Sequence, residues 1–341
     1  MKKIKFSVFF AILFTFMLSA FFVDYSDVAN SQLLAENMQA DYNSQIIAQT
    51  EISDEVVNYA LSSEGVTTMY NLVVFVRFND QAEFTTKSFT KNGVTNSYLQ
   101  IIDAAYNTSK YSLRNYYLTV SGGKLDIQTI YLFANGTNSS FQITKYNIKY
   151  FLANSSLYAS NTTSPEYKGN YINTIGYKTE AEINTRTNEL IDLWTAQVQN
   201  AFNSNIKLTN INGTQNFDYS VLDNMDNDGN IDTLTVLYSP QTTENYLGLQ
   251  WKGPLWSFQT GIANRITISS ASLKSYKYAQ IMMDFYHLAT ITESGNKYIF
   301  TSSSTITHEM GHVLGLLDLY YYGDQNGQKY GDVPVGTWSG M

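Results

Sequence analysis

The sequence contains no cysteine. That absence excludes a disulfide framework, a Cys-ligated zinc site, an iron–sulfur cluster and a thiol nucleophile. Only 4 of the 341 residues are proline, which excludes a collagen-like chain or one rich in polyproline II. Histidine is also scarce. His287, His308 and His312 are the 3 imidazoles, so any histidine chemistry must use these side chains.

Positive charge is in short supply as well. The 21 Lys and Arg residues are outnumbered by 29 Asp and Glu residues, which gives a net charge of −8. A nucleic-acid-binding protein normally carries a basic patch, and the sequence has none. Hydrophobic residues make up 44% of the chain, with 27 Tyr and 19 Phe. We therefore expect a protein with a packed core that does not bind nucleic acid.

The longest hydrophobic run lies at the N-terminus. Residues 1–23 combine three lysines with an uncharged stretch from Phe6 to Val23, which is typical of a secretory signal peptide. About 18 apolar residues also reach the lower limit for a membrane-spanning helix, so an uncleaved anchor is the alternative. Both readings place the bulk of the chain outside the cytoplasm. We expect a secreted bacterial protein that contacts a membrane only if the anchor is retained.

Two further segments follow the N-terminal run. Residues 24–68 are polar and predict a linker or pro-segment, whereas residues 69–341 predict one folded domain. Strand and helix patterns alternate in this domain without an internal repeat, which indicates an α+β fold. We expect strands at 70–78, 124–133, 231–238 and 276–285, helices at 54–61, 98–106, 112–120, 180–202 and 305–316, and irregular surface structure over 134–176.

A pair of histidines lies in the last predicted helix. His308 and His312 flank Glu309 in an H-E-x-x-H motif. Residues four apart share one helix face, so both imidazoles can bind one Zn²⁺ at about 2.0–2.1 Å. The composition would produce this pattern by chance only about 0.002 times. The motif therefore predicts a zinc site.

Glu309 is expected to differ in role from the two histidines. It lies about 100° around the helix from His308, so it cannot easily join the same metal but can reach a water bound to it. Zinc lowers the pKa of such a water to about 7, and a carboxylate can accept its proton. The competing interpretation, a structural zinc, normally needs four protein ligands, often cysteines. We expect a catalytic zinc with Glu309 as the general base.

A catalytic zinc needs a third protein ligand and one open position. Gly315 can adopt a positive φ and end the helix, so the chain can return to the metal at Asp318. The spacing is that of H-E-x-x-H-x-x-G-x-x-H with aspartate in the last position. Asp318 could instead orient a ligand histidine or form part of a turn. We favour ligation because no further histidine follows.

Several segments resemble the immune inhibitor A-type secreted zinc metallopeptidases, a zincin family allied to the metzincins. The most specific likeness is HEMGHVLGLLDLY, at 308–320. The others are NLVVFVRFND (71–80), SLRNYYLTVSGGKLDI (112–127) and PVGTWSGM (334–341), in the family's order. The chain departs from the family at Leu317, where proline is common, and at Ser339-Gly340, where Asp-Leu is common.

The resemblance implies an exported zinc endopeptidase that hydrolyses protein or peptide substrates. It implies a zincin-like α+β catalytic domain over 69–341, in which a twisted mixed sheet lies above a long backing helix and the zinc helix. Substrate would lie in the cleft beside the edge strand. The family's further C-terminal sequence implies a chain truncated at Met341. An extracellular binding or adhesin-like module with a structural zinc is the alternative, and the presence of Glu309 favours the enzyme.

An acidic loop is a second candidate metal site. Its spacing resembles the start of a D-x-D-x-D-G calcium loop, although Thr235 stands where an EF-hand has its bidentate glutamate. Carboxylates this close repel one another unless a cation lies among them, so we expect Ca²⁺. An ordinary Asn/Asp-rich turn is the alternative. The candidate ligands are Asn224, Asp226, Asp228 and Asp232, with Asp218 and Asp223 at the periphery.

Overall fold

The structure is a computed structural model. It describes residues 65–91, 94–109, 112–136, 138–157, 172–239, 253–282 and 304–316. The predicted signal or anchor, the predicted helix at 54–61, His287 and Asp318 lie outside these ranges. Within them, no helix is both long enough and apolar enough to cross a membrane.

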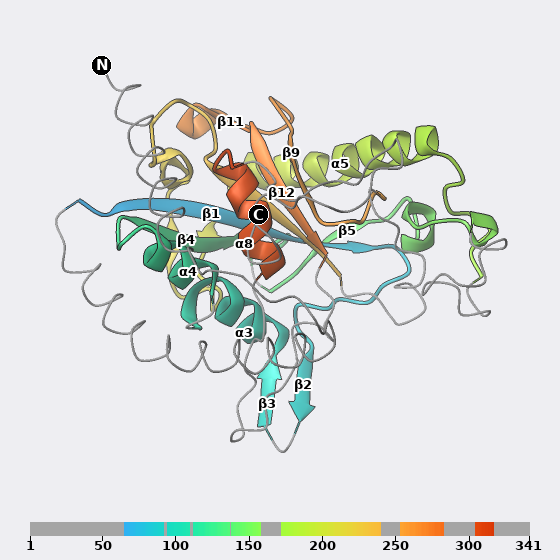
Figure 1. The fold of residues 1–341 in the computed structure, drawn as a ribbon, viewed down its shortest axis with the longest axis horizontal. Helices are drawn as coiled ribbons and strands as arrows, with labels where there is room; N and C mark the ends of the chain where they lie inside the picture. The colour runs from blue at the N-terminus through green and yellow to red at the C-terminus, as the bar shows by residue number, and fades with distance from the viewer. Residues whose placement is uncertain are drawn as a thin grey trace, which may run out of the picture.

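A mixed eight-stranded sheet forms the centre of the described fold (Figure 1). Its strands are β1 Thr67–Phe78, β4 Leu125–Leu132, β5 Phe141–Ile143, β6 Leu208–Thr209, β7 Asn216–Phe217, β8 Thr233–Tyr238, β9 Phe258–Gly261 and β12 Lys277–Met282. The order is β7-β6-β4-β1-β8-β12-β9, and β5 pairs with β1 beyond the end of β4. β4, β1, β8 and β12 are parallel, whereas β6 and β9 run antiparallel to their neighbours.

β1 lies near the middle of the sheet, where a nearly continuous apolar run is expected because both faces are buried. Successive side chains of a strand point to opposite faces. Leu72 and Val74 accordingly lie in one hydrophobic cluster, and Val73 and Phe75 lie in the other. All four are fully buried, so both faces of the sheet are covered.

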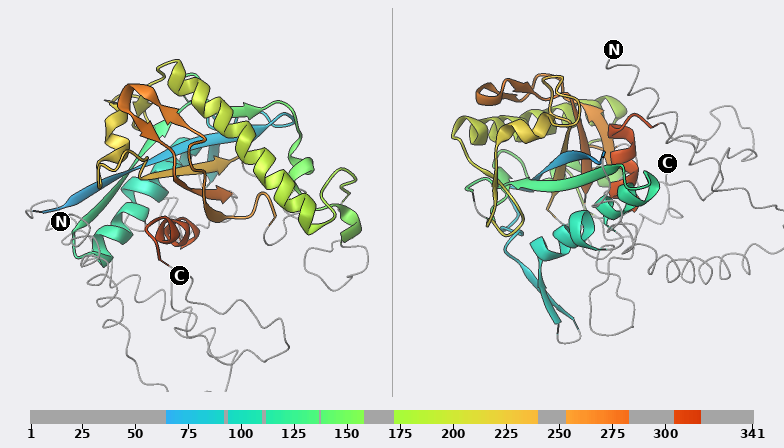
Figure 2. Two further views of the ribbon diagram at one scale, coloured as in Figure 1. Left: turned by 90° about the horizontal axis from the view of Figure 1, so that it is seen from above. Right: turned by 90° about the vertical axis from the view of Figure 1, so that its left-hand side faces the viewer.

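Helices cover both faces of the sheet. The main ones are α3 Tyr98–Asp103, which continues as the π-helix η1 Ala104–Thr108, then α4 Leu113–Val120, α5 Glu180–Asn203 and α8 Ser304–Val313. Trp194 and Val198 of α5 pack in the cluster of Leu72. α3, α4 and α8 pack in the cluster of Phe75 on the other face. Figure 2 shows α5 on one side of the sheet and α4 with α8 on the other.

This arrangement corrects one prediction. We expected the long helix at 180–202 and the zinc helix to lie below the same face, but α5 and α8 lie on opposite faces. The apolar stripe of a helix shows that one side of the helix is buried. It does not show which face of the sheet the helix packs against. The helices that share a face with α8 are α3 and α4.

The prediction of irregular surface structure over 134–176 was wrong in part, because some of this segment lies in the core. Phe141 in β5, Ile148 and Phe151 are buried against the α5 side of the sheet. These apolar residues are separated by Gln, Thr, Lys, Asn and Tyr, so no helix or strand period was visible in the sequence. Short helices in this segment are η2 Ile148–Phe151 and η3 Ser155–Leu157.

The other predicted elements that fall on described residues are confirmed, and their caps show why they begin where they do. Ser112 caps α4 by accepting from the Asn115 backbone N–H, and Thr179 caps α5 in the same way. β12 is described as far as Met282. The remaining elements are β2 Ser88–Lys91, β3 Val94–Ser97, η4 Tyr219–Asp223, β10 Thr267–Ile268, η5 Ser269–Ala271 and β11 Leu273–Lys274.

Candidate active site

The helix that carries H-E-x-x-H is α8. Ile306, Met310 and Val313 recur at helical spacing and are buried in the core shared with α3 and α4. The helix lies against β12, the edge strand β9 and α4 (Figure 1). Burial of this apolar stripe leaves His308 and His312 half-buried on the same helix. The two imidazoles therefore lie between core and solvent.

The two imidazoles meet at their Nε2 atoms. These atoms are 3.2 Å apart, and the rings cross at 83°. Nδ1 of His312 lies 2.9 Å from the carbonyl oxygen of Leu316. A carbonyl only accepts, so this contact places a proton on Nδ1. In the neutral ring, Nε2 of His312 then carries a lone pair toward His308, the tautomer that a metal ligand needs.

The spacing of the imidazoles fits a single tetrahedral metal. Two nitrogens bound at about 2.0–2.1 Å with a tetrahedral angle between them would lie roughly 3.3 Å apart. The observed separation of the two Nε2 atoms is 3.2 Å. The separation of His308 and His312 therefore matches that of two ligands of one Zn²⁺.

Glu309 follows His308 on the same helix. Its side chain is buried, with 5% of its surface exposed. A carboxylate in such a place is costly unless it is paired or used, because burial disfavours the charged form. The burial of Glu309 on the helix that carries both imidazoles is compatible with its predicted role as general base.

The end of α8 follows the prediction closely. Gly315 has φ of +92°, a value that favours glycine. The Leu316 N–H donates to the Gly311 carbonyl and the Gly315 N–H donates to that of His312, each at 2.9 Å. These two bonds form a Schellman motif, which ends the helix and redirects the chain. Ligation by Asp318 stays a prediction because this residue lies outside the described ranges.

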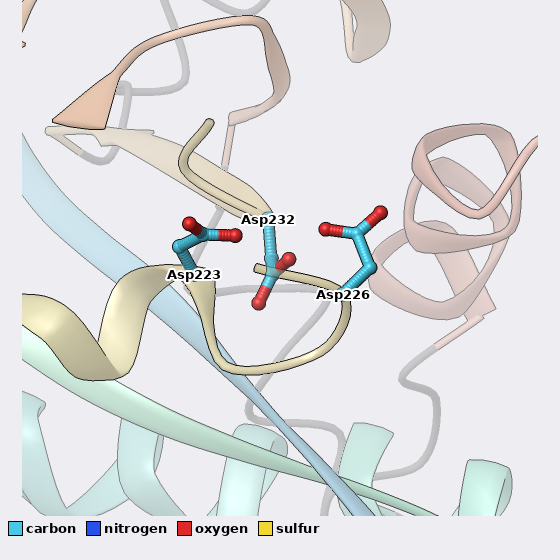
Figure 3. A group of neighbouring side chains, drawn as sticks. All are labelled: Asp223, Asp226 and Asp232. Carbon is cyan, nitrogen blue, oxygen red and sulfur yellow. The ribbon is translucent and has the colours of Figure 1, made fainter. Parts of the chain in front are cut away.

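Three aspartates of the acidic loop converge. Carboxylate oxygens of Asp223, Asp226 and Asp232 lie within 4.8 Å of one another (Figure 3). Asp223 was predicted to be peripheral, but it belongs to this group. Asp228 is a turn residue, whose carboxylate accepts from the backbone and side-chain nitrogens of Asn230.

The remaining candidates have other surroundings. Asp218 accepts from the Ser220 backbone at 2.9 Å and caps η4. Oδ1 of Asn224 is buried and makes no hydrogen bond within the described residues. The sequence left Asp223 at the periphery of the group because side chains in irregular loops do not follow a fixed sequence spacing. The signal available was its place three residues before Asp226 in the same acidic run.

The electrostatics of the loop favour a cation. Burial, followed by the charges of the neighbouring aspartates, raises the pKa of Asp232 to about 7. Burial and the charge of Asp228 also raise the pKa of Asp226. Without a cation, ionising Asp226 and Asp232 costs free energy. A divalent cation among them would make the ionised carboxylates favourable instead of unfavourable.

Comparisons with known proteins add no assignment. No protein-family model matches the chain, and no curated protein matches it. The likeness to zinc metallopeptidases therefore rests on the motif residues quoted above.

Proposed function

We propose that the protein is an exported zinc-dependent endopeptidase that hydrolyses peptide bonds of protein substrates. The observation that carries the proposal is the 3.2 Å approach of the two Nε2 atoms on the helix that also carries buried Glu309. An imidazole pair alone could bind a structural metal. The added carboxylate supplies the proton acceptor that hydrolysis requires. Export is proposed from the residues at 1–23.

In this proposal each residue has a distinct task. His308 and His312 hold the zinc, and Asp318 is the proposed third ligand. Bound zinc would supply a Lewis acid and lower the pKa of a coordinated water to about 7. Glu309 would accept the proton of the attacking water and pass it to the leaving amine. The Nδ1–H of His312, held by the Leu316 carbonyl, keeps that ring in the ligating tautomer.

The neighbouring sheet supports a zincin-like arrangement. β9 is the last strand beside β12 in the described sheet, and α8 lies against both strands. The outer edge of β9 could pair with an extended peptide through main-chain hydrogen bonds. Such a peptide would lie beside the helix that carries His308 and Glu309. We propose this edge as the substrate site.

Removal of the metal tests the proposal. A chelator should abolish casein digestion by the purified protein. Once the zinc is removed, no Lewis acid remains at the site to activate the water. Stoichiometric Zn²⁺ should restore digestion, and Mg²⁺ should not, since Mg²⁺ prefers oxygen ligands. The measurement is the rate at which acid-soluble peptides are released. Digestion that continues unchanged in excess chelator would contradict the proposal.

We also propose that Ca²⁺ binds among Asp223, Asp226 and Asp232. A ligand that binds only the folded state at about a hundred times its Kd stabilises by about 2.7 kcal/mol, on the order of 5–10 °C in Tm. Calcium should raise Tm of the unchanged protein by this amount. Asp226→Asn should remove most of the rise and leave the zinc content intact.

Asp228→Asn is the matched control for the calcium prediction. It removes the same charge from the same loop, yet asparagine keeps an oxygen that can accept from the Asn230 backbone. Calcium should still raise Tm in this variant. An equal calcium response in Asp226→Asn and the unchanged protein would place the cation elsewhere.

A further inference from the structure

A tyrosine from another helix contacts the backbone of the zinc helix. The hydroxyl of Tyr117, in α4, donates to the carbonyl oxygen of Thr307, in α8, at 2.9 Å. Tyr117 is 1% exposed, and the bond is buried. Its two ends lie 190 residues apart in the sequence, so the fold brings them together.

A lysine contacts the other end of the same helix. Nζ of Lys277, at the start of β12, donates to the carbonyl oxygen of Val313 at 3.0 Å. A cation at a helix C-terminus is stabilised by the carbonyls that have no partner within the helix. Thr307 immediately precedes His308, and Val313 immediately follows His312. The two donors therefore bracket the five-residue motif from outside the helix.

The placement of these donors bears on the two imidazoles. The Thr307 carbonyl belongs to the peptide unit that carries the His308 N–H. In α-helical geometry the same carbonyl accepts from the Gly311 N–H, next to His312. A carbonyl has two lone pairs, so Tyr117 can add a second bond to it. This bond, with that of Lys277, resists rotation of α8 about its axis, which would change the direction of both Nε2 atoms.

We propose that Tyr117 and Lys277 are positioning residues of the zinc centre. This inference rests on the proposed function. Neither residue is a proposed metal ligand or proton acceptor. Each holds the backbone on one side of H-E-x-x-H, so that the two Nε2 atoms keep the spacing that one zinc requires. Groups that orient metal ligands typically contribute 10–100-fold to metal affinity.

Tyr117→Phe tests the first contact in the full chain. It should weaken zinc binding, measured by chelator competition, by about 10-fold or more. It should also change the visible absorption of the cobalt-substituted protein, which reports ligand geometry. The matched control is Tyr106→Phe. Tyr106 is buried in the same cluster, and its hydroxyl makes no hydrogen bond within the described residues.

The control separates positioning from stability. Both phenylalanine variants can lower Tm of the metal-free protein, but Tyr106→Phe should keep the zinc affinity and the cobalt spectrum of the unchanged protein. Wild-type zinc affinity and cobalt spectrum in Tyr117→Phe would overturn the role of Tyr117. Equal losses in both variants would also overturn it.

Lys277→Met tests the other end and keeps the inference testable if Tyr117→Phe does not fold. It should weaken zinc binding by a similar factor, whereas Lys274→Met, at an exposed residue of β11, should not. Wild-type zinc affinity in Lys277→Met would overturn the role of Lys277. Absence of zinc binding by the unchanged protein would instead overturn the proposed function, and this inference with it.

Discussion

Glu309→Gln is expected to retain zinc and lose peptidase activity by at least ~10²-fold, the usual contribution of a general base. Glutamine has nearly the size of glutamate, so it can occupy the buried position on α8 without a cavity. It cannot accept the proton of the attacking water. His308 and His312 are unchanged, so zinc bound per chain should stay near one. The measurements are casein turnover and metal content of the same preparation.

A matched control for Glu309→Gln is Glu180→Gln. Glu180 is exposed in the first turn of α5, on the opposite face of the sheet from α8. The control makes the same chemical change and should keep full activity. Activity near wild type in Glu309→Gln would contradict the assignment of the base.

His312→Ala is expected to lose both zinc and activity. The variant removes one Nε2 ligand, and it also removes the ring whose Nδ1 binds the Leu316 carbonyl after the helix. Two protein ligands would remain, which is fewer than the three that a catalytic zinc usually has. Metal content should therefore fall below about 0.1 per chain after dialysis. Activity should fall with it. Excess zinc in the assay should restore little of the activity.

The third histidine offers the comparison for His312→Ala. His287→Ala removes an imidazole that lies outside the motif, so zinc content should remain near one per chain. The contrast between the variants matters most: loss of metal in His312→Ala and retention in Glu309→Gln separates a ligand from a base. Full zinc content in His312→Ala would show that the ligand set is wrong.

The elements that could be predicted from the sequence are those with a strong local signal. β1 was recognisable from its apolar run, and α5 from its apolar spacing. The end of α8 at Gly315 was also predictable, because a positive φ at that position favours glycine. Each of these signals lies within a few residues of the feature it determines.

The features that were missed depend on contacts between distant residues. The sheet face that α5 covers is set by chain topology, and β5 has only 3 residues, one of them polar. Tyr117 could not be singled out among 27 tyrosines, since its partner lies 190 residues away. Lys277 gave no signal for the same reason.

The candidate site divides in the same way. His308, Glu309 and His312 were predictable because helical periodicity alone brings residues four apart together. The structure adds the 3.2 Å approach of the two Nε2 atoms and the contact of His312 with the Leu316 carbonyl. The acidic loop has no such period, so the prediction included Asp228 and left Asp223 at the periphery.

The position of the metal is the most direct test of the zinc site. X-ray diffraction from crystals of the purified protein, measured on both sides of the zinc absorption edge, locates zinc by its anomalous signal. We expect one peak about 2.0–2.1 Å from Nε2 of both His308 and His312, close to Glu309. Two results would contradict the zinc peptidase proposal. One is a zinc peak confined to the acidic loop, and the other is no zinc peak with the two imidazoles hydrogen-bonded to each other.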